Sequence, residues 1–235
     1  MKALVSGGYM ESEEKEELTE EEKEKQRRSN YWFYAILFVT LLCIIAFRVY
    51  WGKTFSGVIV DGDSMKQTLF DGDSFLLQHV NDAEDLEHGD IIVVHVGDYE
   101  ECASVKSGFI IKRLIAMEGD KVKCEDGQVY ICYAETTEFV ALDEPYAYYG
   151  AGTGNKADYD FDVYEVGEGE IFFLGDNRFN SCDSRYMQEG GSHLDGKLYK
   201  ASDVAGIVPE WAIEHQAVIE KIFFRSHSCV KKAKN

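Results

Sequence analysis

The sequence is short of basic residues, with 24 Lys and Arg against 43 Asp and Glu, and its formal net charge is -19 at pH 7. Proteins that bind a nucleic-acid backbone draw their affinity from clustered Lys and Arg side chains that contact phosphates. The excess of negative charge therefore argues against a nucleic-acid partner.

Signals for a metal site or cofactor are also missing. The chain has no CxxC motif and no Cys/His cluster at zinc-ligand spacing. Residues 158–170, DYDFDVYEVGEGE, alternate aspartates as a calcium loop does, but Val163 stands where such a loop needs glycine. We therefore predict no metal and no cofactor. Cys43 lies in an apolar run, and the other five cysteines are an odd number, so at least one is unpaired or paired outside the chain: Cys102, Cys124, Cys132, Cys182 and Cys229.

The sequence also lacks a GxSxG motif, so a hydrolase with a nucleophile elbow has no support. The six histidines are scattered, and His79 and His95 lie in or beside apolar segments that suit a structural histidine. A Ser/His/Asp triad stays open but has no support.

What is present first is a charged tail followed by one long apolar run. Residues 11–28 are almost wholly charged, which predicts disorder or a solvated helix within a tail over 1–30. Residues 31–47 carry no charge, and the run extends to Trp51, so we predict a transmembrane helix over 31–51. The run follows thirty polar residues and is rimmed by aromatics, which favours a permanent anchor over a cleaved signal peptide or a buried core helix.

The basic residues that flank this run predict its orientation. Four of them lie at 23–28 before the run, while Arg48 and Lys53 lie at its other end. Because positive residues favour the cytoplasmic side, we expect a single-pass cell-membrane protein with a cytoplasmic N-terminus and an extracytoplasmic domain.

The remaining residues have the pattern of strands separated by turns. Apolar segments with few helices between them predict a mainly β domain over 54–212, from TFSGVIV, SFLLQHV, DIIVVHV, GFIIKRLIAM, KVKCE, QVYICY and EIFFLG. CEDGQV predicts a hairpin with a type I′ turn, and 147–170 a long loop or small β excursion. The tail over 213–235 is too poor in apolar residues to span a membrane, but a final helix at the membrane surface fits it.

Three segments of this domain could carry chemistry. In VDGDSMKQTLFDGD, residues 60–73, Ser64 lies between Asp-Gly pairs that are ordinary turn signals. In FIIKRLIAM, Lys112 either reaches an exposed face or is desolvated, and desolvation would lower its pKa and supply a neutral amine as a general base. In LGDNRFNSCDSR, residues 174–185, the polar residues after an apolar strand are either a surface connector or a hydrogen-bonded scaffold.

Together these segments resemble the bacterial type I signal peptidase family, membrane-anchored serine proteases with a Ser/Lys dyad. DGDSM with TLFDGD resembles the nucleophile motif, IIKRLIAMEGD the lysine motif, and GDNRFNSCDSR matches GDNRxxSxDSR in full. The match runs in order through residues 54–208, and LDEPY resembles a weaker family element. The resemblance implies a twisted antiparallel β scaffold of the signal-peptidase type with one N-terminal transmembrane helix. Its implied partners are the lipid bilayer and exported preproteins with small residues before the cleavage site.

The resemblance also implies a role for each matched residue. Ser64 would be the nucleophile and Lys112 the general base, while Ser181 would orient the lysine amine. The oxyanion loop would comprise Gly62, Asp63 and Met65, with the Ser64 backbone N–H as its main donor. The supporting salt-bridge network would comprise Asp176, Arg178, Asp183 and Arg185.

Several residues depart from the family pattern. Gln67 and Glu118 stand where relatives have proline, which frees the backbone and raises the entropy lost on ordering these loops. Ile207 replaces a usual lysine, and Cys182 follows Ser181. No departure removes a proton-transfer group, so we expect activity.

Two other functions are alternatives to the protease. A non-proteolytic or specialised assembly factor for surface fibres on the same scaffold would account for the missing prolines, but both Ser64 and Lys112 are retained. A self-cleaving repressor shares a Ser/Lys dyad on a related β fold, but its DNA-binding helices are absent and the chain is acidic.

Overall fold

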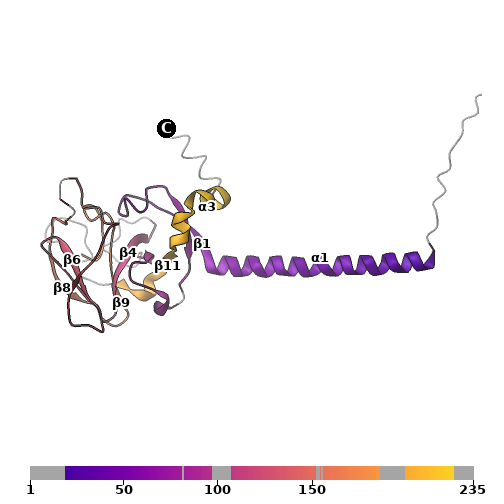
Figure 1. Cartoon of the computed structure of the whole chain (residues 1–235), viewed down its shortest axis with the longest axis horizontal. Helices are drawn as coiled ribbons and strands as arrows, with labels where there is room; N and C mark the ends of the chain where they lie inside the picture. The colour runs from indigo at the N-terminus through magenta and orange to yellow at the C-terminus, as the bar shows by residue number, and fades with distance from the viewer. Residues whose placement is uncertain are drawn as a thin grey trace, which may run out of the picture. The chain divides into compact units, whose positions relative to one another are not determined.

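The computed structural model describes residues 19–80, 82–96, 107–151, 154, 156–185 and 199–224 (Figure 1). The chain divides into two compact units, Met1–Trp51 and Gly52–Asn235. Predictions that concern residues 11–18, Cys102, Cys229 and the last eleven residues lie outside the described part of the chain.

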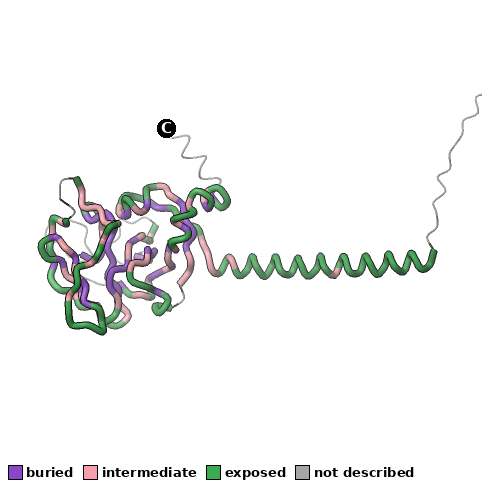
Figure 2. Tube along the Cα trace, in the orientation of Figure 1, coloured by how far each residue is buried: buried purple, intermediate pink, exposed green. Residues whose placement is uncertain are grey.

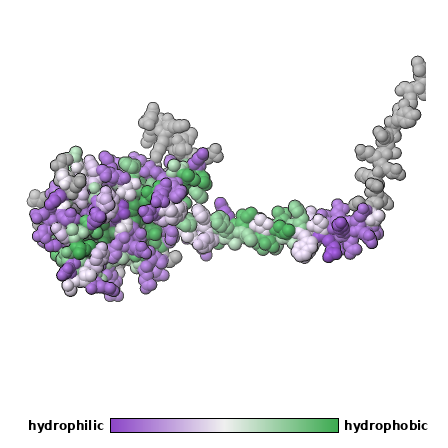
Figure 3. Space-filling view, in the orientation of Figure 1, coloured by the Kyte–Doolittle hydropathy of each residue, from purple (hydrophilic) through white to green (hydrophobic). Residues whose placement is uncertain are grey.

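The first unit contains most of one long helix, α1, Glu20–Thr54. Thr19 and Glu22 form a capping box, in which each side chain accepts a hydrogen bond from the other residue's backbone N–H. No residue of α1 is buried, and Figures 2 and 3 show a helix exposed along its length and apolar over its middle. The uncharged run over 31–47 is about 26 Å long at 1.5 Å per residue. Among the described residues, α1 is the one helix long and apolar enough to cross a membrane, and it is consistent with a membrane anchor.

The second unit is built on a seven-stranded sheet whose order is β1-β2-β11-β3-β4-β9-β10. Each neighbouring pair is antiparallel. Its strands are β1 Phe55–Ile59, β2 Ser74–Gln78, β3 Ile91–His95, β4 Phe109–Met117, β9 Glu170–Leu174, β10 Tyr199–Lys200 and β11 Val204–Val208.

A second, four-stranded antiparallel sheet has the order β7-β6-β5-β8. Its strands are β5 Lys121–Glu125, β6 Gln128–Cys132, β7 Val140–Ala141 and β8 Phe161–Glu165. Asp126 and Gly127, with φ of 52° and 70°, form the predicted tight turn between β5 and β6. The short helices are η1 Ala83–Asp85, η3 Ala201–Asp203, α2 Glu210–Glu214 and α3 Gln216–Phe223.

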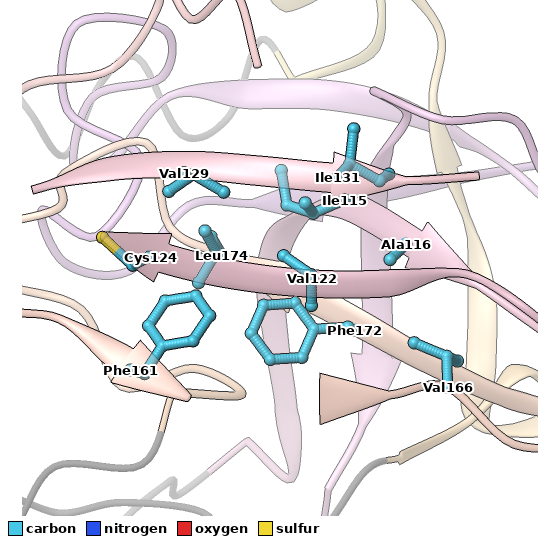
Figure 4. Packing of buried hydrophobic residues seen from close by; sticks show 10 residues of the cluster. All are labelled: Ile115, Ala116, Val122, Cys124, Val129, Ile131, Phe161, Val166, Phe172 and Leu174. Atoms are coloured by element: carbon cyan, nitrogen blue, oxygen red, sulfur yellow. The ribbon is translucent and has the colours of Figure 1, made fainter. Parts of the chain in front are cut away.

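The core consists of three clusters of buried apolar side chains. One packs β5, β6 and β8 of the small sheet against β4 and β9 of the large sheet (Figure 4). The other two share β3, because alternate residues of a strand point to opposite faces: Ile92 and Val94 belong to one cluster, Ile91 and Val93 to the other. A strand buried on both faces reads as a continuous apolar run, which is why IIVVH was recognisable in the sequence.

The predicted fold class is confirmed: the chain is mainly antiparallel β with one N-terminal apolar helix. All seven predicted strands are present, within one or two residues of their expected ends. Among the described residues of 147–170, one complete strand occurs, β8, whose partner is β5, and β9 begins at the last residue of the segment. Three short or late strands, β7, β10 and β11, were not predicted.

Candidate active site

The Ser64 loop connects β1 to β2 and is closed by its two Asp-Gly pairs. Gly62 and Gly72 adopt φ of 94° and 77°, which glycine tolerates and other residues rarely do. Val60 N–H donates to Asp73 O, and Gly72 N–H to Val60 O, so the ends of the loop are held together. Between them, residues 63–69 form two consecutive turns, closed by hydrogen bonds to Asp63 O and Met65 O, and the buried side chains of Met65 and Leu69 anchor them.

Lys112 reaches this loop from the middle of β4, where its cross-strand partner is Ile92. Its side chain is buried, with a relative exposure of 3%. The Nζ atom donates hydrogen bonds to Ser64 Oγ and to the backbone oxygen of Ile111, both at 2.8 Å. The structure therefore brings together the predicted nucleophile and the predicted base, which are 48 residues apart in the sequence.

The burial of this amine changes its acidity. Desolvation is the largest influence, and it lowers the pKa of Lys112 to about 8, although the nearby Asp183 carboxylate opposes the change. A desolvated ammonium loses hydration that two uncharged hydrogen-bond partners do not replace, which favours the neutral form. At neutral pH a useful fraction of Lys112 can accept a proton.

A second loop, residues 175–185, closes over the Ser64 loop from the end of β9. Asn177 N–H donates to Ser64 O at 2.9 Å, and Asn177 Nδ2 donates to Asp63 O at 3.0 Å. Gly175 lies so close to the Ser64 backbone that a Cβ on it would stand 2.6 Å from Ser64 O and overlap the Ser181 hydroxyl. The φ angle of Gly175 does not lie in the left-handed region, so its backbone conformation does not require glycine. Glycine is required there because the Ser64 backbone and the Ser181 side chain leave no room for a Cβ.

Ser181 lies beside Gly175, but its hydroxyl is buried and has no hydrogen-bond partner among the residues that the structure describes. It helps to lower the pKa of Asp183, although the geometry is not that of a hydrogen bond. The two hydrogen bonds of Lys112 Nζ go to Ser64 and Ile111 instead. The role of Ser181 in orienting the amine stays a prediction.

The buried ion pairs differ from the network that the sequence predicted. Asp183 pairs with Arg185 at 2.6 Å and accepts from Gly175 N–H, so these two predicted residues do bind each other. Burial alone would raise the pKa of Asp183, but the Arg185 guanidinium outweighs it and holds that pKa below its ordinary value. Arg185 also donates to Arg178 O at 2.7 Å, which holds the loop in place.

The other two predicted residues pair with partners that the prediction left out. Asp176 accepts two hydrogen bonds from Arg113, at 2.8 and 2.6 Å, and one from Thr68 of the nucleophile loop. Arg178 pairs with Glu144, and both side chains are buried. A carboxylate held by a bidentate arginine is fixed in direction as well as position.

Signals for these missed residues were available in the sequence. Arg113 follows Lys112 in an apolar strand, and a guanidinium at such a place requires an anionic partner. Glu144 belongs to LDEPY, which resembles a weaker family element. Thr68 and Asn177 lie in the matched motifs TLFDGD and GDNRFNSCDSR, but their roles could not be assigned from sequence, because their partners lie 108 and 114 residues away.

The remaining site predictions concern ligands and the departures from the family pattern. Within the described residues, no group of three or more His, Cys, Asp or Glu side chains is placed to hold a metal ion. Glu118, where relatives have proline, accepts a hydrogen bond from Gly169 N–H at 2.9 Å. Gln67 adopts φ of 82°, a left-handed conformation that proline cannot adopt. At position 67 the backbone therefore has a conformation that a proline could not adopt, so the replacement of proline changes the shape of the loop as well as its conformational freedom.

Comparison with known proteins gives a consistent result. A family model described as "Signal peptidase, peptidase S26" matches residues 29–219. Signal peptidase I of Bacillus licheniformis is 32% identical over 156 residues, which cover 66% of this chain and 76% of that protein. Signal peptidase I of Streptococcus pneumoniae serotype 4 is 30% identical over 206 residues, covering 72% and 87%. A crystal structure of a signal peptidase I from Enterococcus faecalis V583 is 26% identical and covers 53% of this chain and 97% of that one, with a TM-score of 0.38.

Proposed function

The chain belongs to the signal peptidase family, peptidase S26, and has signal peptidase I activity; on this premise we propose that Ser64 is its nucleophile and Lys112 its general base. One observation carries the proposal: the buried Lys112 amine lies 2.8 Å from Ser64 Oγ, and its pKa is lowered to about 8. A serine hydroxyl is a weak nucleophile until an adjacent base takes its proton.

The proposed reaction begins when neutral Lys112 accepts the Ser64 proton as Oγ attacks the scissile carbonyl carbon of a preprotein. Negative charge develops on the carbonyl oxygen, which receives a hydrogen bond from the Ser64 N–H. Lys112 then gives its proton to the departing amine of the mature chain, which leaves an ester on Ser64. A water molecule, deprotonated by Lys112, hydrolyses that ester and releases the signal peptide.

The substrates of a signal peptidase are preproteins, and the finer preference proposed here is for small side chains at the first and third residues before the cut. Met65 follows Ser64 in the chain and belongs with Val60 to one buried cluster, where they are 1% and 4% exposed, so the core directly behind the nucleophile loop is closely packed. A large side chain would clash there, whereas a small one would fit.

The proposed location is the cell membrane, with α1 as a single-pass anchor, the N-terminus in the cytoplasm and the β domain outside. The apolar middle of α1 and the four basic residues at 23–28 support this orientation. Protease added to intact cells should then digest the β domain and leave residues 1–30 protected; digestion of residues 1–30 instead would reverse the orientation.

The direct test of the dyad is incubation of the full-length chain with a preprotein, followed by sequencing of the new N-terminus. Ser64→Ala and Lys112→Ala should each abolish cleavage while the β domain stays folded. Lys121→Ala is the matched control, because Lys121 lies exposed on β5 in an ion pair with Glu165. Normal cleavage by Lys112→Ala would show that the proposed base is wrong.

A further inference from the structure

Asn177 makes hydrogen bonds to both peptide groups that flank Ser64. Its side-chain Nδ2 donates to the oxygen of Asp63, and its backbone N–H donates to the oxygen of Ser64, at 3.0 and 2.9 Å. Asn177 itself is 4% exposed. A buried residue therefore fixes the nucleophile's backbone on both sides.

The first of these bonds sets the direction of the Ser64 N–H. The Asp63 carbonyl and the Ser64 N–H belong to the same peptide group, which is planar and trans. In such a group the C=O and N–H bonds point in opposite directions. Because the carbonyl points at Asn177, the N–H points away from the 175–185 loop, and within the described residues it has no hydrogen-bond partner.

The Asn177 amide is itself held in one orientation. The backbone N–H of Asn180 donates to Asn177 Oδ1 at 3.2 Å, so the oxygen faces Asn180 and the NH₂ group faces Asp63. A backbone bridge also pairs Asn177 with Tyr148. The amide cannot rotate to present its oxygen to Asp63 without losing the bond to Asn180.

We propose that Asn177 is a positioning residue that aims the Ser64 N–H at the developing oxyanion. The proposal rests on the proposed role of Ser64 as nucleophile. A donor stabilises the transition state only if it is already directed to where charge develops, because turning it during the reaction costs free energy. Gly62 in the same loop has no side chain that could add a donor, so the direction of the Ser64 N–H matters more.

The expected effect of losing the Asn177 donor is on the chemical step. The Asp63 oxygen keeps a second bond, from Lys66 N–H at 3.0 Å, so the peptide group would be loosened rather than released. Complete loss of an oxyanion donor lowers kcat by about 10² to 10³. A loosened donor should therefore lower kcat by roughly tenfold to a hundredfold and leave KM nearly unchanged.

The test compares Asn177→Asp with Asn180→Ala in the full-length chain, using preprotein cleavage and a peptide aldehyde. Asn177→Asp keeps the acceptor for Asn180 N–H but replaces the donor by an oxygen. Asn180→Ala keeps the backbone N–H and serves as control. The aldehyde reports the oxyanion directly, because Ser64 Oγ adds to its carbon, the hydroxyl proton passes to Lys112, and the former carbonyl oxygen takes the oxyanion position.

The proposal predicts that Asn177→Asp loses aldehyde affinity and kcat in parallel, with kcat compared on the high-pH plateau, where Lys112 is neutral in both proteins, and with KM nearly unchanged. If the buried carboxylate unfolds the domain, Asn177→Ser replaces it, since it shortens the side chain without adding charge. A kcat within about threefold of wild type, or a rise in KM alone, would overturn the proposal. Failure of the proposed function is distinguishable, because then Ser64→Ala would cleave the preprotein as wild type does.

Discussion

Lys112 Nζ lies 2.8 Å from Ser64 Oγ in the interior of the β domain. The approach depends on two elements: β4, which presents the lysine, and the loop after β1, which presents the serine. The lysine makes its other hydrogen bond to a backbone oxygen, and within the described part of the chain no carboxylate bonds to it directly to hold it in the charged form. Desolvation by burial therefore outweighs the influence of the nearby Asp183 carboxylate, and the pKa of Lys112 falls to about 8.

The first prediction concerns the pH dependence of cleavage. The free-enzyme profile of kcat/KM should rise with pH and level off above an apparent pKa near 8, because only neutral Lys112 can accept the serine proton. The measurement is initial cleavage rates of one preprotein from pH 6 to 10. Lys121→Ala should leave the profile unchanged, and a profile flat across this range would contradict the assignment.

The second prediction concerns stability. Lys112 has a lower pKa in the folded chain, about 8, than its ordinary value of 10.5, so the unfolded chain binds more protons between these pH values. The buried lysine therefore destabilises the fold most below pH 8, by roughly 3 kcal/mol, and this cost disappears as pH rises toward 10.5. Lys112→Met should show a stability advantage that shrinks over the same range. Denaturant unfolding at several pH values measures it, and a difference independent of pH would refute the linkage.

The third prediction concerns Gly175. A methyl group there would overlap the Ser181 hydroxyl and stand 2.6 Å from Ser64 O, so the loop must move away from the nucleophile. Gly175→Ala should lower kcat/KM by about a hundredfold, the cost of displacing a reacting group by roughly 1 Å. Gly52→Ala, at a glycine whose added Cβ would meet no atom within 4 Å, is the control and should cleave normally. If both variants cleave equally well, the close contact between the Gly175 loop and the Ser64 loop is not required for cleavage.

The fourth prediction reverses an expectation from the family pattern. Relatives have proline at the position of Gln67, but φ here is 82° and proline requires about -65°. Gln67→Pro should destabilise the chain by about 1 to 3 kcal/mol, whereas Gln67→Gly should be neutral or stabilising, because glycine adopts positive φ without strain. Thermal unfolding of the two variants decides between them. Stabilisation by Gln67→Pro would show that the loop adopts the family's backbone.

The strands could be predicted because their physics is local. IIVVH and EIFFL are continuous apolar runs, and the Asp-Gly turn of the β5–β6 hairpin needs only the residues that form it. The apolar run of α1 was equally clear, and its start at Glu20 rather than Tyr31 reflects a capping box that extends the helix into charged sequence.

The contacts of the site could be predicted only in part. The resemblance indicated Ser64 and Lys112, but Arg113, Glu144 and Asn177 gain their roles from partners in distant segments. The positive φ of Gln67 could not be foreseen either, because local preference disfavours it for a residue with a Cβ. It is held by the turn around it, in which Thr68 and Leu69 both donate to Met65 O.

The central claim is that Ser64 and Lys112 act as one unit, and a double-mutant comparison of preprotein cleavage tests it most directly. Ser64→Ala and Lys112→Ala should each reduce kcat/KM to the same low level, and the double variant should be no worse, because either change removes the whole proton-transfer step. If Lys112→Ala cleaves nearly as well as wild type, or if the double variant loses the product of the two single losses, the dyad does not exist.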